Sequence, residues 1–513
     1  MQPAIGNLLE QSARRFGTKA ALVTSERTLT FTELDRLSTR LAAGLADAGV
    51  RPGDRVTLWL ENGWRWVVAY FGILRAGAVV NPANSLLTVD EVEYMVADCG
   101  ARVAFVRPGK SLNPRSTALT CIGDPPLGQA GGTRFDNLLE RGASGLHRWT
   151  APRVNPTDTC SIFYTSGTTG FPKGAILRHE SVLMNCAMTS LMHGLHAEDT
   201  VVTALPCAHV YGNVVLNSAI LAGITLVLLP RLDEKAILEA VERYRATVLQ
   251  GVPSMYLALL NVADLERFDL GSLRLCTVGG QGMAISKMQE IEQRLRCPLV
   301  ELWGMTELSG LGTTHPYNGP SKLGSIGIPL PFSEIRIADP DATERDVAPF
   351  EVGELLVRGP HVMDGYYNKP AETAAAIDSR GWLRTGDLVR RDERGYLYLV
   401  DRIKDVILSG GYTIYPAEVE RVIAHFDPVS AALAVPVDDE LRGQIVKVTI
   451  VLRPGHSCTS EDVLAHCREH LAVFKIPRVV EFADRLPTGH TGKVMRRQPP
   501  ALQTFTTPRQ RSR

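Results

Sequence analysis

The stretch SIFYTSGTTGFPKGA at residues 161–175 decides how the rest of the chain is interpreted. An apolar run ends at Tyr164, and three glycines, four hydroxyl side chains and Lys173 follow it. Glycines let backbone N–H groups turn toward an anion without a Cβ clash. Hydroxyls can donate to phosphate oxygens, and a lysine adds positive charge. A short Gly/Ser/Thr segment is more often a flexible surface loop, but the length and order of this one favour a loop that wraps phosphates.

The chain does not match the signature motifs of three large enzyme classes. In a P-loop the lysine follows a glycine, whereas Lys173 follows Pro172. The segment PTGHTGKV at 487–494 is closer, but Pro487 replaces the first glycine and Val494 replaces the Ser or Thr. No G-x-G-x-x-G follows a strand pattern, and no G-x-S-x-G nucleophile elbow occurs. These motifs therefore give no support to a P-loop kinase, a dinucleotide-binding enzyme or an α/β-hydrolase.

Length and composition predict a soluble globular protein with at least two domains. A chain of 513 residues exceeds one ordinary core, and 45% hydrophobic with 21% charged residues is typical of globular proteins. The formal net charge is zero, which gives no support to nucleic acid or an anionic membrane as a partner. No signal peptide and no integral membrane segment are expected. The nine cysteines are scattered without C-x-x-C spacing, so we expect reduced thiols and a cytoplasmic location.

Strand and helix patterns alternate along most of the chain. Helices are expected at 30–49 and 62–77, and again at 233–245 and 286–296. Short apolar strands that end at Pro or Gly lie between them. The apolar region 213–230 is interpreted as a buried helix that runs into a buried strand. This alternation predicts an α/β fold with mostly parallel sheets covered by helices.

The sequence pattern changes after Gly327, where short β segments between turns predict a β-rich subdomain. Together with the preceding part it would complete a large N-terminal domain over 1–400. The segment DRIKD at 401–405 is the expected hinge, and 406–500 is expected to form a small α+β C-terminal domain. The polar tail 501–513 is expected to be disordered.

The chain resembles the adenylate-forming (ANL) superfamily, which contains acyl-CoA synthetases, aryl-CoA ligases, firefly-type luciferases and peptide-synthetase adenylation domains. YTSGTTGFPKG is similar to the phosphate-binding loop of that family. Further family stretches follow in order: LPCAHVYG at 205, LWGMTE at 302, RTGD at 384, DRIKDVILSGGYTIYPAEVE at 401 and PTGHTGKV at 487. The resemblance covers residues 5–500 and favours the acyl-CoA synthetase branch.

The resemblance implies a reaction in two steps. A carboxylate attacks the α-phosphate of ATP, which gives an acyl-adenylate and pyrophosphate. The thiol of CoA then attacks the adenylate, which gives a thioester and AMP. ATP, Mg²⁺ and CoA are therefore the expected cofactors, and a mobile C-terminal domain would present a different face in each step. No Ser–His or Cys–His nucleophile is required, because the attacking oxygen belongs to the substrate.

By the same resemblance, most of the nucleotide site comes from the large domain. Glu307 would bind Mg²⁺, Thr306 would contact the α-phosphate, and Trp303 would pack beside the adenine. Asp387 would bind the ribose hydroxyls with support from Arg402. The expected ATP- and AMP-binding residues are Thr165, Ser166, Gly167, Thr168, Thr169, Gly170, Lys173, Trp303, Gly304, Met305, Thr306, Asp387 and Arg402.

The C-terminal domain would supply the groups that change between the two steps. Lys493 is the expected catalytic residue of adenylation, where it would bridge the substrate carboxylate and the α-phosphate. Lys404 occupies the hinge position, although it could also be a solvated lysine. Gly410 and Gly411 would line the tunnel for the pantetheine arm of CoA.

A hydrophobic acid fits the expected acyl pocket better than an amino acid. His209 resembles the family's gate residue and is also assigned to the catalytic set, with a satisfied interior histidine as the alternative. Residues 210–218 hold no carboxylate that could bind a substrate amine. The expected lining is His209, Val210, Asn213, Val252, Tyr256, Gly279, Gly280, Gln281, Met305 and Leu308.

The leading hypothesis is an acyl-CoA synthetase for a fatty, aryl or polycyclic natural-product acid. A ligase that passes the acyl group to the phosphopantetheine thiol of a carrier protein is the second hypothesis. The third is a catalytically silent binding protein on the same fold, which the intact motifs disfavour. The identity of the acid, the pathway and the oligomeric state stay open. A homodimer is one of the open oligomeric states.

Overall fold

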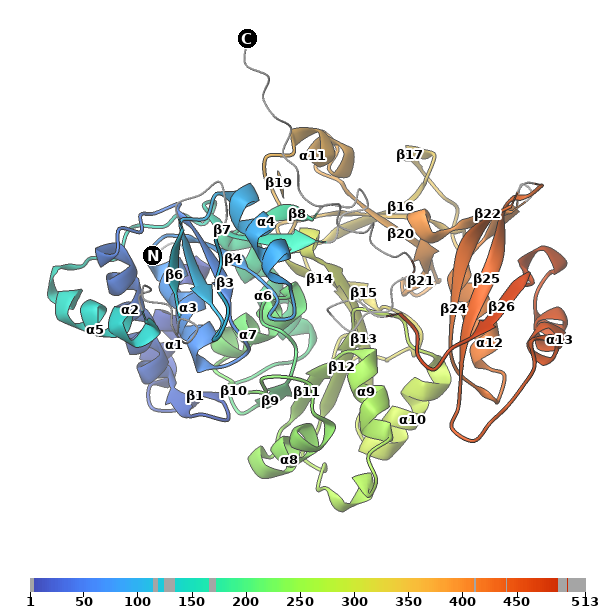
Figure 1. Cartoon of the computed structure of the whole chain (residues 1–513), viewed down its shortest axis with the longest axis horizontal. Coiled ribbons are helices and arrows are strands. Elements are labelled where there is room, and N and C mark those ends of the chain that lie inside the picture. The colour runs from blue at the N-terminus through green and yellow to red at the C-terminus, as the bar shows by residue number, and fades with distance from the viewer. Residues whose placement is uncertain are drawn as a thin grey trace, which may run out of the picture. The chain divides into compact units, whose positions relative to one another are not determined.

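The protein is described from a computed structural model, which describes residues 4–113, 119–123, 134–165, 172–409, 412–439, 441–487 and 496. The chain divides into two compact units, whose helices and strands are labelled in Figure 1. One unit comprises Met1–Thr165 and Lys173–Leu399, and the other is built on Val400–Arg513. The expected tail 501–513 lies outside the described residues.

The first sheet of the larger unit has seven strands in the order β19-β8-β7-β4-β3-β5-β6. The run from β7 to β6 is parallel, and β8 and β19 continue it antiparallel. The phosphate stretch thus joins two antiparallel neighbours at the border of a parallel sheet. The strands are β3 (Arg55–Trp59), β4 (Val79–Pro82), β5 (Val103–Val106), β6 (Thr120–Ile122), β7 (Thr159–Thr165), β8 (Lys173–Arg178) and β19 (Gly365–Tyr366).

The second sheet has nine strands in the order β15-β14-β13-β12-β11-β9-β10-β1-β2. Its six inner strands from β13 to β1 are parallel, and β14, β15 and β2 pair antiparallel at the edges. The strands are β1 (Ala20–Val23), β2 (Thr28–Thr30), β9 (Thr200–Thr203), β10 (Thr225–Leu228), β11 (Val248–Gly251), β12 (Leu275–Gly279), β13 (Leu299–Met305), β14 (Gly310–Thr314) and β15 (Ile328–Pro329).

Helices pack on both of these sheets, as the α/β pattern predicts (Figure 1). The expected helix at 30–49 is α2, which Thr30 and Glu33 begin with a reciprocal capping box. The apolar region 213–230 is confirmed as a helix followed by a strand, with the helix starting earlier, at Val210. The helices are α1 (Leu8–Phe16), α2 (Phe31–Asp47), α3 (Trp64–Arg75), α4 (Val89–Cys99), α5 (Phe135–Gly145), α6 (His179–Met192), α7 (Val210–Ala222), α8 (Glu234–Tyr244), α9 (Pro253–Leu260), α10 (Ile285–Leu295) and α11 (Pro370–Ala376).

Asn62 does not open the helix that the sequence predicted from that residue. The helix α3 begins at Trp64, and the Asn62 side chain instead reaches the loops of the nine-stranded sheet. Its amide nitrogen donates to the Leu205 carbonyl at 2.9 Å, and its amide oxygen accepts from the Cys207 N–H at 2.9 Å. A side chain that could cap a helix therefore ties the two sheets together just before the LPCAHVYG segment.

The β segments after Gly327 form a separate five-stranded antiparallel sheet in the order β17-β16-β18-β20-β21. This confirms the predicted β-rich region of the larger unit. The strands are β16 (Glu334–Asp339), β17 (Ala342–Asp346), β18 (Gly353–Arg358), β20 (Leu383–Arg391) and β21 (Leu397–Arg402).

The smaller unit has its own sheet and its own core. Its strands run in the order β23-β22-β25-β24, with β26 parallel to β25. Apolar side chains of this sheet and of two helices form one buried cluster. The elements are β22 (Ile407–Ser409), β23 (Tyr412–Ile414), α12 (Pro416–Ala424), β24 (Val429–Asp439), β25 (Gly443–Leu452), α13 (Ser460–His470) and β26 (Val479–Phe482). The mixed helix and sheet content is that expected for the C-terminal part.

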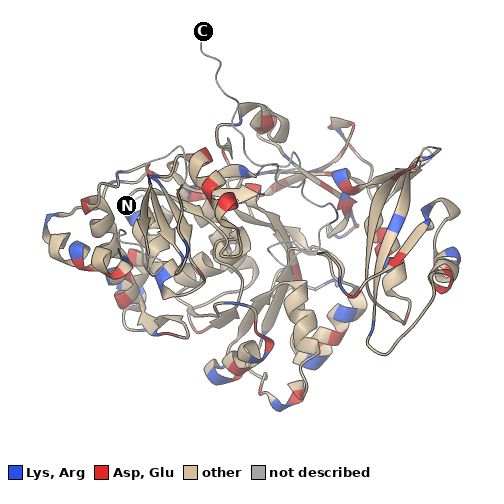
Figure 2. Cartoon of the chain, viewed as in Figure 1, with Lys and Arg blue, Asp and Glu red and all other residues tan. Residues whose placement is uncertain are grey.

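The formal net charge of zero does not hide a separation of basic and acidic segments. Figure 2 shows basic and acidic residues interspersed along the elements of the chain. Among the described residues, no helix has both the length and the apolar character needed to cross a bilayer.

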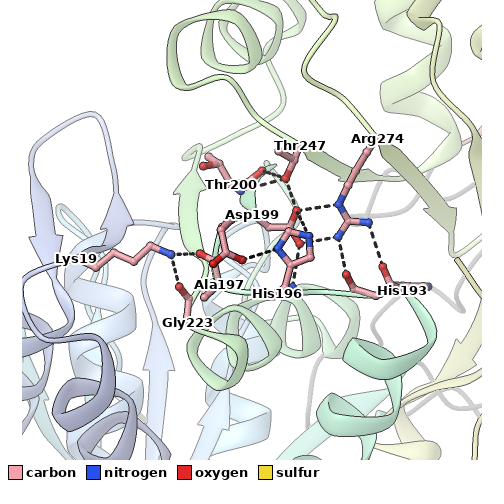
Figure 3. A network of polar contacts seen from close by, with 11 residues as sticks. Lys19, His193, His196, Ala197, Asp199, Thr200, Gly223, Thr247 and Arg274 are labelled. Atoms are coloured by element: carbon pink, nitrogen blue, oxygen red, sulfur yellow. Dashed lines mark hydrogen bonds and ion pairs between the residues drawn. The ribbon is translucent and has the colours of Figure 1, made fainter.

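A buried polar network supports the nine-stranded sheet at the ends where its strands begin (Figure 3). Its centre is Asp199, just before β9, whose carboxylate receives Arg274 Nε at 2.8 Å and the Thr247 hydroxyl at 2.6 Å. Arg274 also donates to the Gly194 carbonyl at 2.9 Å, beyond the end of α6. Lys19 donates to the carbonyls of Ala197 and Gly223. The network thus joins α6 and the starts of β9, β11 and β12.

Candidate active site

The quoted stretch 161–175 includes the end of β7 and the start of β8, which pair as a hairpin. In the β7–β8 pairing, Thr165 lies opposite Lys173, and the Thr165 hydroxyl contacts the Lys173 carbonyl at 3.5 Å. Thr165 and Lys173 are therefore held side by side. The other expected residues of the loop lie outside the described residues: Ser166, Gly167, Thr168, Thr169 and Gly170.

Glu307 is buried in the turn that joins β13 to β14, a 3₁₀ turn over Thr306–Leu308. Its Oε1 accepts a hydrogen bond of 2.7 Å from the Tyr366 hydroxyl. Its carbonyl oxygen accepts from the Met363 N–H at 2.8 Å. Glu307 is therefore not a loose surface carboxylate, because these bonds fix both its backbone and its side chain.

Tyr366 also connects this turn to the phosphate hairpin. The Lys173 ammonium lies 5.4 Å from the centroid of the Tyr366 ring, within the range of a cation–π contact. Burial, and then the nearby charge of Glu307, raises the pKa of Tyr366. The hydroxyl therefore stays protonated and acts as a donor to the carboxylate.

Asp387 and Trp303 form the clearest single contact of the site. Trp303 Nε1 donates to Asp387 Oδ2 at 2.8 Å, and both side chains are buried. Trp303 comes from β13 of the nine-stranded sheet, and Asp387 comes from β20 of the β-rich sheet. The sequence placed these residues at the adenine and at the ribose separately, and their direct hydrogen bond is a new finding.

The backbone of RTGD bends at Gly386, whose φ of +71° lies in the region that favours glycine. The buried carboxylate of Glu354 accepts from the Gly386 N–H at 3.1 Å and binds Arg384. The Thr385 hydroxyl accepts from the Asp387 N–H at 3.1 Å. These bonds interrupt the regular ladder between β18 and β20 and fix the backbone at Asp387.

His209 is exposed, so the alternative of an interior histidine is wrong. It lies at the N-cap of α7, where its Nδ1 accepts from the Tyr211 N–H at 3.2 Å. Capping fixes the ring at the start of a helix that is otherwise buried. This position is compatible with a gate, and the gate role stays a prediction.

The expected acyl-pocket residues divide into two groups. His209, Val252, Gly280, Gln281 and Met305 have exposed or half-exposed positions, whereas Val210, Asn213, Tyr256, Gly279 and Leu308 are buried. Tyr256 is fully buried in a hydrophobic cluster, and its hydroxyl donates to the carbonyls of Leu249 and Thr277. For all ten residues, the pocket role stays a prediction.

The expected hinge segment belongs to the smaller unit, whose boundary falls between Leu399 and Val400. Arg402 is half-buried and Lys404 is exposed. Buried carboxylates at the two ends of the segment hold it in place, since Asp401 accepts from the Ala417 N–H at 2.9 Å and Asp405 pairs with Arg496. Burial raises the pKa of Asp401. Gly410, Gly411 and Lys493 lie outside the described residues.

Family models match both parts of the chain. The AMP-binding enzyme model matches residues 9–367, and the AMP-binding enzyme C-terminal domain model matches residues 418–493. The chain belongs to this family. Its members on the acyl-CoA synthetase branch are acid–thiol ligases, and the chain is one of these adenylate-forming enzymes.

Curated relatives match this chain over nearly its whole length. A long-chain-fatty-acid–CoA ligase of Bacillus subtilis is 34% identical, over 96% of this chain and 93% of the relative. A Mycobacterium tuberculosis enzyme named 3-[(3aS,4S,7aS)-7a-methyl-1,5-dioxo-octahydro-1H-inden-4-yl]propanoyl:CoA ligase is 36% identical, over 96% of this chain and 97% of the relative. Both are CoA ligases, although their acids differ in shape.

Solved structures agree with this assignment. The o-succinylbenzoate coenzyme A synthetase of Bacillus subtilis, in complex with ATP and a magnesium ion, superposes with a TM-score of 0.81 at 29% identity. The match covers 96% of this chain and 98% of that chain. The enzyme described here is thus an ATP-binding ligase of the same fold.

Several residues of the site carried no signal in the sequence. Tyr366, Glu354 and Met363 contact site residues across 30 to 60 positions of chain, and each stands in a segment with ordinary turn or strand composition. Of the residues named here that fix the site, only Gly386 had a signal in the sequence, because a glycine before an aspartate indicates a turn.

Proposed function

We propose that this enzyme activates a hydrophobic carboxylic acid with Mg·ATP and transfers the acyl group to CoA. The acid's oxygen attacks the α-phosphorus, the bond to the bridging oxygen breaks, and pyrophosphate leaves. The CoA thiol then attacks the acyl carbon, AMP leaves and the thiol proton is released. The observation that carries the proposal is the fixed set of Trp303, Glu307 and Asp387 in a chain with full-length CoA-ligase relatives.

The donor chemistry of the described residues fits a nucleotide-bound Mg²⁺. Among these residues there is no cluster of three or more His, Cys, Asp or Glu side chains that could hold a metal alone. Mg²⁺ commonly takes one or two carboxylates, and phosphate oxygens and water complete its octahedron. Glu307 offers such a carboxylate, and the bound metal would neutralise phosphate charge.

Asp387 has the right chemistry for a ribose site. Its carboxylate can accept from both ribose hydroxyls, while the bond from Trp303 fixes its plane. We assign residues 406–500 the task of supplying Lys493 in the first step and Gly410 with Gly411 in the second.

The acid is proposed to be a fatty, aryl or polycyclic acid. The absence of a carboxylate at 210–218 disfavours a substrate amine, and the half-exposed residues of the expected pocket include the apolar Val252 and Met305. The two relatives are named for a long-chain fatty acid and for a bicyclic propanoic acid, which supports a large apolar group without choosing between them.

The function is tested by incubating the enzyme with Mg·ATP and a panel of acids, with and without CoA. The panel contains fatty acids, aryl acids, polycyclic keto acids and, as a negative control, α-amino acids. Mass spectrometry of acyl-AMP and acyl-CoA is the readout. We expect acyl-CoA from one hydrophobic class. Acyl-AMP that persists after CoA is added would favour a carrier-protein acceptor, and wild-type protein that binds no ATP would favour a silent binding protein.

The substitution Trp303→Phe tests the nucleotide site directly. Phenylalanine keeps an aromatic ring and removes the N–H that holds Asp387. A hydrogen bond to a charged group contributes about 1.5–3 kcal/mol, so we expect the KM for ATP to rise at least about tenfold. Trp382→Phe is the matched control, because Trp382 is a buried tryptophan of the β-rich region and should leave this KM unchanged. An unchanged KM in Trp303→Phe would contradict the assignment.

A further inference from the structure

Tyr366 stands between the two charged groups that the proposed function uses on the phosphate side of ATP. Its hydroxyl donates to Glu307 Oε1 at 2.7 Å, and its ring faces the Lys173 ammonium at 5.4 Å. One side chain therefore contacts both Glu307, the expected metal ligand, and Lys173, the first residue of β8. No family motif quoted for this chain includes it.

The backbone of Tyr366 is fixed by the phosphate hairpin itself. It lies on β19, which pairs antiparallel with β8, so that Tyr366 is opposite Ala175. The next residue, Tyr367, donates its N–H to the Gly174 carbonyl at 2.7 Å. A movement of the hairpin end would therefore move the Tyr366 ring as well.

A second set of contacts fixes Tyr366 from the other side. Its N–H donates at 2.9 Å to the hydroxyl of Thr373, a residue in the middle of α11. Gly365 before it has a φ of +141°, and a Cβ there would lie only 2.5 Å from the Thr373 methyl group. The chain thus needs glycine at 365 to bring the tyrosine into this position.

We propose that Tyr366 is a positioning residue that aligns the Glu307 carboxylate for Mg²⁺ and couples it to the phosphate-binding hairpin. This rests on the proposed function. The hydroxyl holds one carboxylate oxygen, which fixes the plane of the carboxylate before the metal arrives. Hydrogen-bond partners of metal ligands typically affect metal affinity or activity by about 10–100-fold.

The ring contributes separately from the hydroxyl. Its face keeps the Lys173 ammonium next to the turn of Glu307, so a cation and an anion are held on one aromatic side chain. When Mg·ATP binds, both groups are already at the position where phosphate charge must be balanced. The hydroxyl is thus expected to affect the metal, and the ring is expected to affect the phosphates with or without metal.

The test is equilibrium binding of the non-hydrolysable analogue AMPPNP, which needs no carboxylic acid and no turnover. Affinity is measured by calorimetry with Mg²⁺ and again with EDTA. For Tyr366→Phe we expect the Kd with Mg²⁺ to rise about 10–100-fold and the Kd in EDTA to stay within about twofold. For Tyr366→Leu, which also removes the ring, both values should rise.

Two controls keep the result interpretable. Tyr367→Phe removes a neighbouring hydroxyl and should leave both Kd values unchanged, and thermal unfolding verifies that each variant is folded. The double variant Tyr366→Phe/Glu307→Gln should bind Mg·AMPPNP no more weakly than Glu307→Gln alone, because the two groups act as one unit.

Failure of the inference differs from failure of the proposed function. If folded Tyr366→Phe binds like the wild type, or weakens equally with and without Mg²⁺, the positioning role is wrong. If the wild type binds no AMPPNP under either condition, the nucleotide-dependent function itself is wrong.

Discussion

Lys493→Ala is expected to lower the rate of acyl-adenylate formation by about 10²–10³-fold, as does loss of one strong transition-state donor. The first step brings a carboxylate to a negatively charged phosphate, and negative charge accumulates where the new bond forms. A single ammonium group between the two reactants would stabilise that charge in the transition state. The expected measurement is pre-steady-state formation of acyl-AMP, with the acid identified by the panel.

The second step separates this role from a general loss of structure. Acyl-AMP supplied from outside should be converted to acyl-CoA by Lys493→Ala at a rate within a fewfold of the wild type, because the lysine acts only on the first step. Lys235→Ala is a matched control, since Lys235 is an exposed lysine on α8 far along the chain. Equal loss of both half-reactions would show that Lys493 is not specific to adenylation.

The elements of the fold were predictable because their signals are local. The helix α2 follows a capping box and a helical apolar period, and β9 to β12 are short apolar runs that end at Pro or Gly. Strand pairing depends on distant chain and was not predictable. The strand β1 lies beside β10, two hundred residues later, and Asn62 binds the 205–207 segment instead of capping α3.

The site shows the same division. Asp387 and Glu307 were identified because they stand in long family stretches, but the partners that fix them were not. Trp303 reaches Asp387 across 84 residues, and Tyr366 reaches Glu307 across 59. The sequence likewise did not indicate that the Tyr256 hydroxyl donates to the carbonyls of Leu249 and Thr277 on two neighbouring strands. Which side chains such contacts bury depends on tertiary packing, and the local sequence pattern does not reveal that packing.

Asp199→Ala is expected to lower the free energy of unfolding by about 3–5 kcal/mol, the usual result of removing one partner of a buried ion pair. The Asp199 side chain is fully buried, and Arg274 would lose the carboxylate with which it pairs while it stays largely buried. The Thr247 hydroxyl and the His196 N–H would lose an acceptor too. Urea denaturation provides the measurement, and Glu198→Ala, at an exposed neighbouring carboxylate, should change stability by about 0.5 kcal/mol or less.

The same network predicts a pH dependence of stability with a definite sign. Burial opposes ionisation of Asp199, but the hydrogen bonds from Arg274, Thr247 and the His196 N–H outweigh it and lower its pKa below 3.8. The contribution is therefore complete above the unfolded-state pKa and is lost as the pH falls through the lower folded-state pKa. Wild-type stability should fall more steeply in that acid range than the stability of Asp199→Asn, which cannot titrate there. Parallel pH profiles, together with a small effect of Asp199→Ala at neutral pH, would mean that Arg274 is held by its carbonyl partners and by Tyr317 rather than by the carboxylate.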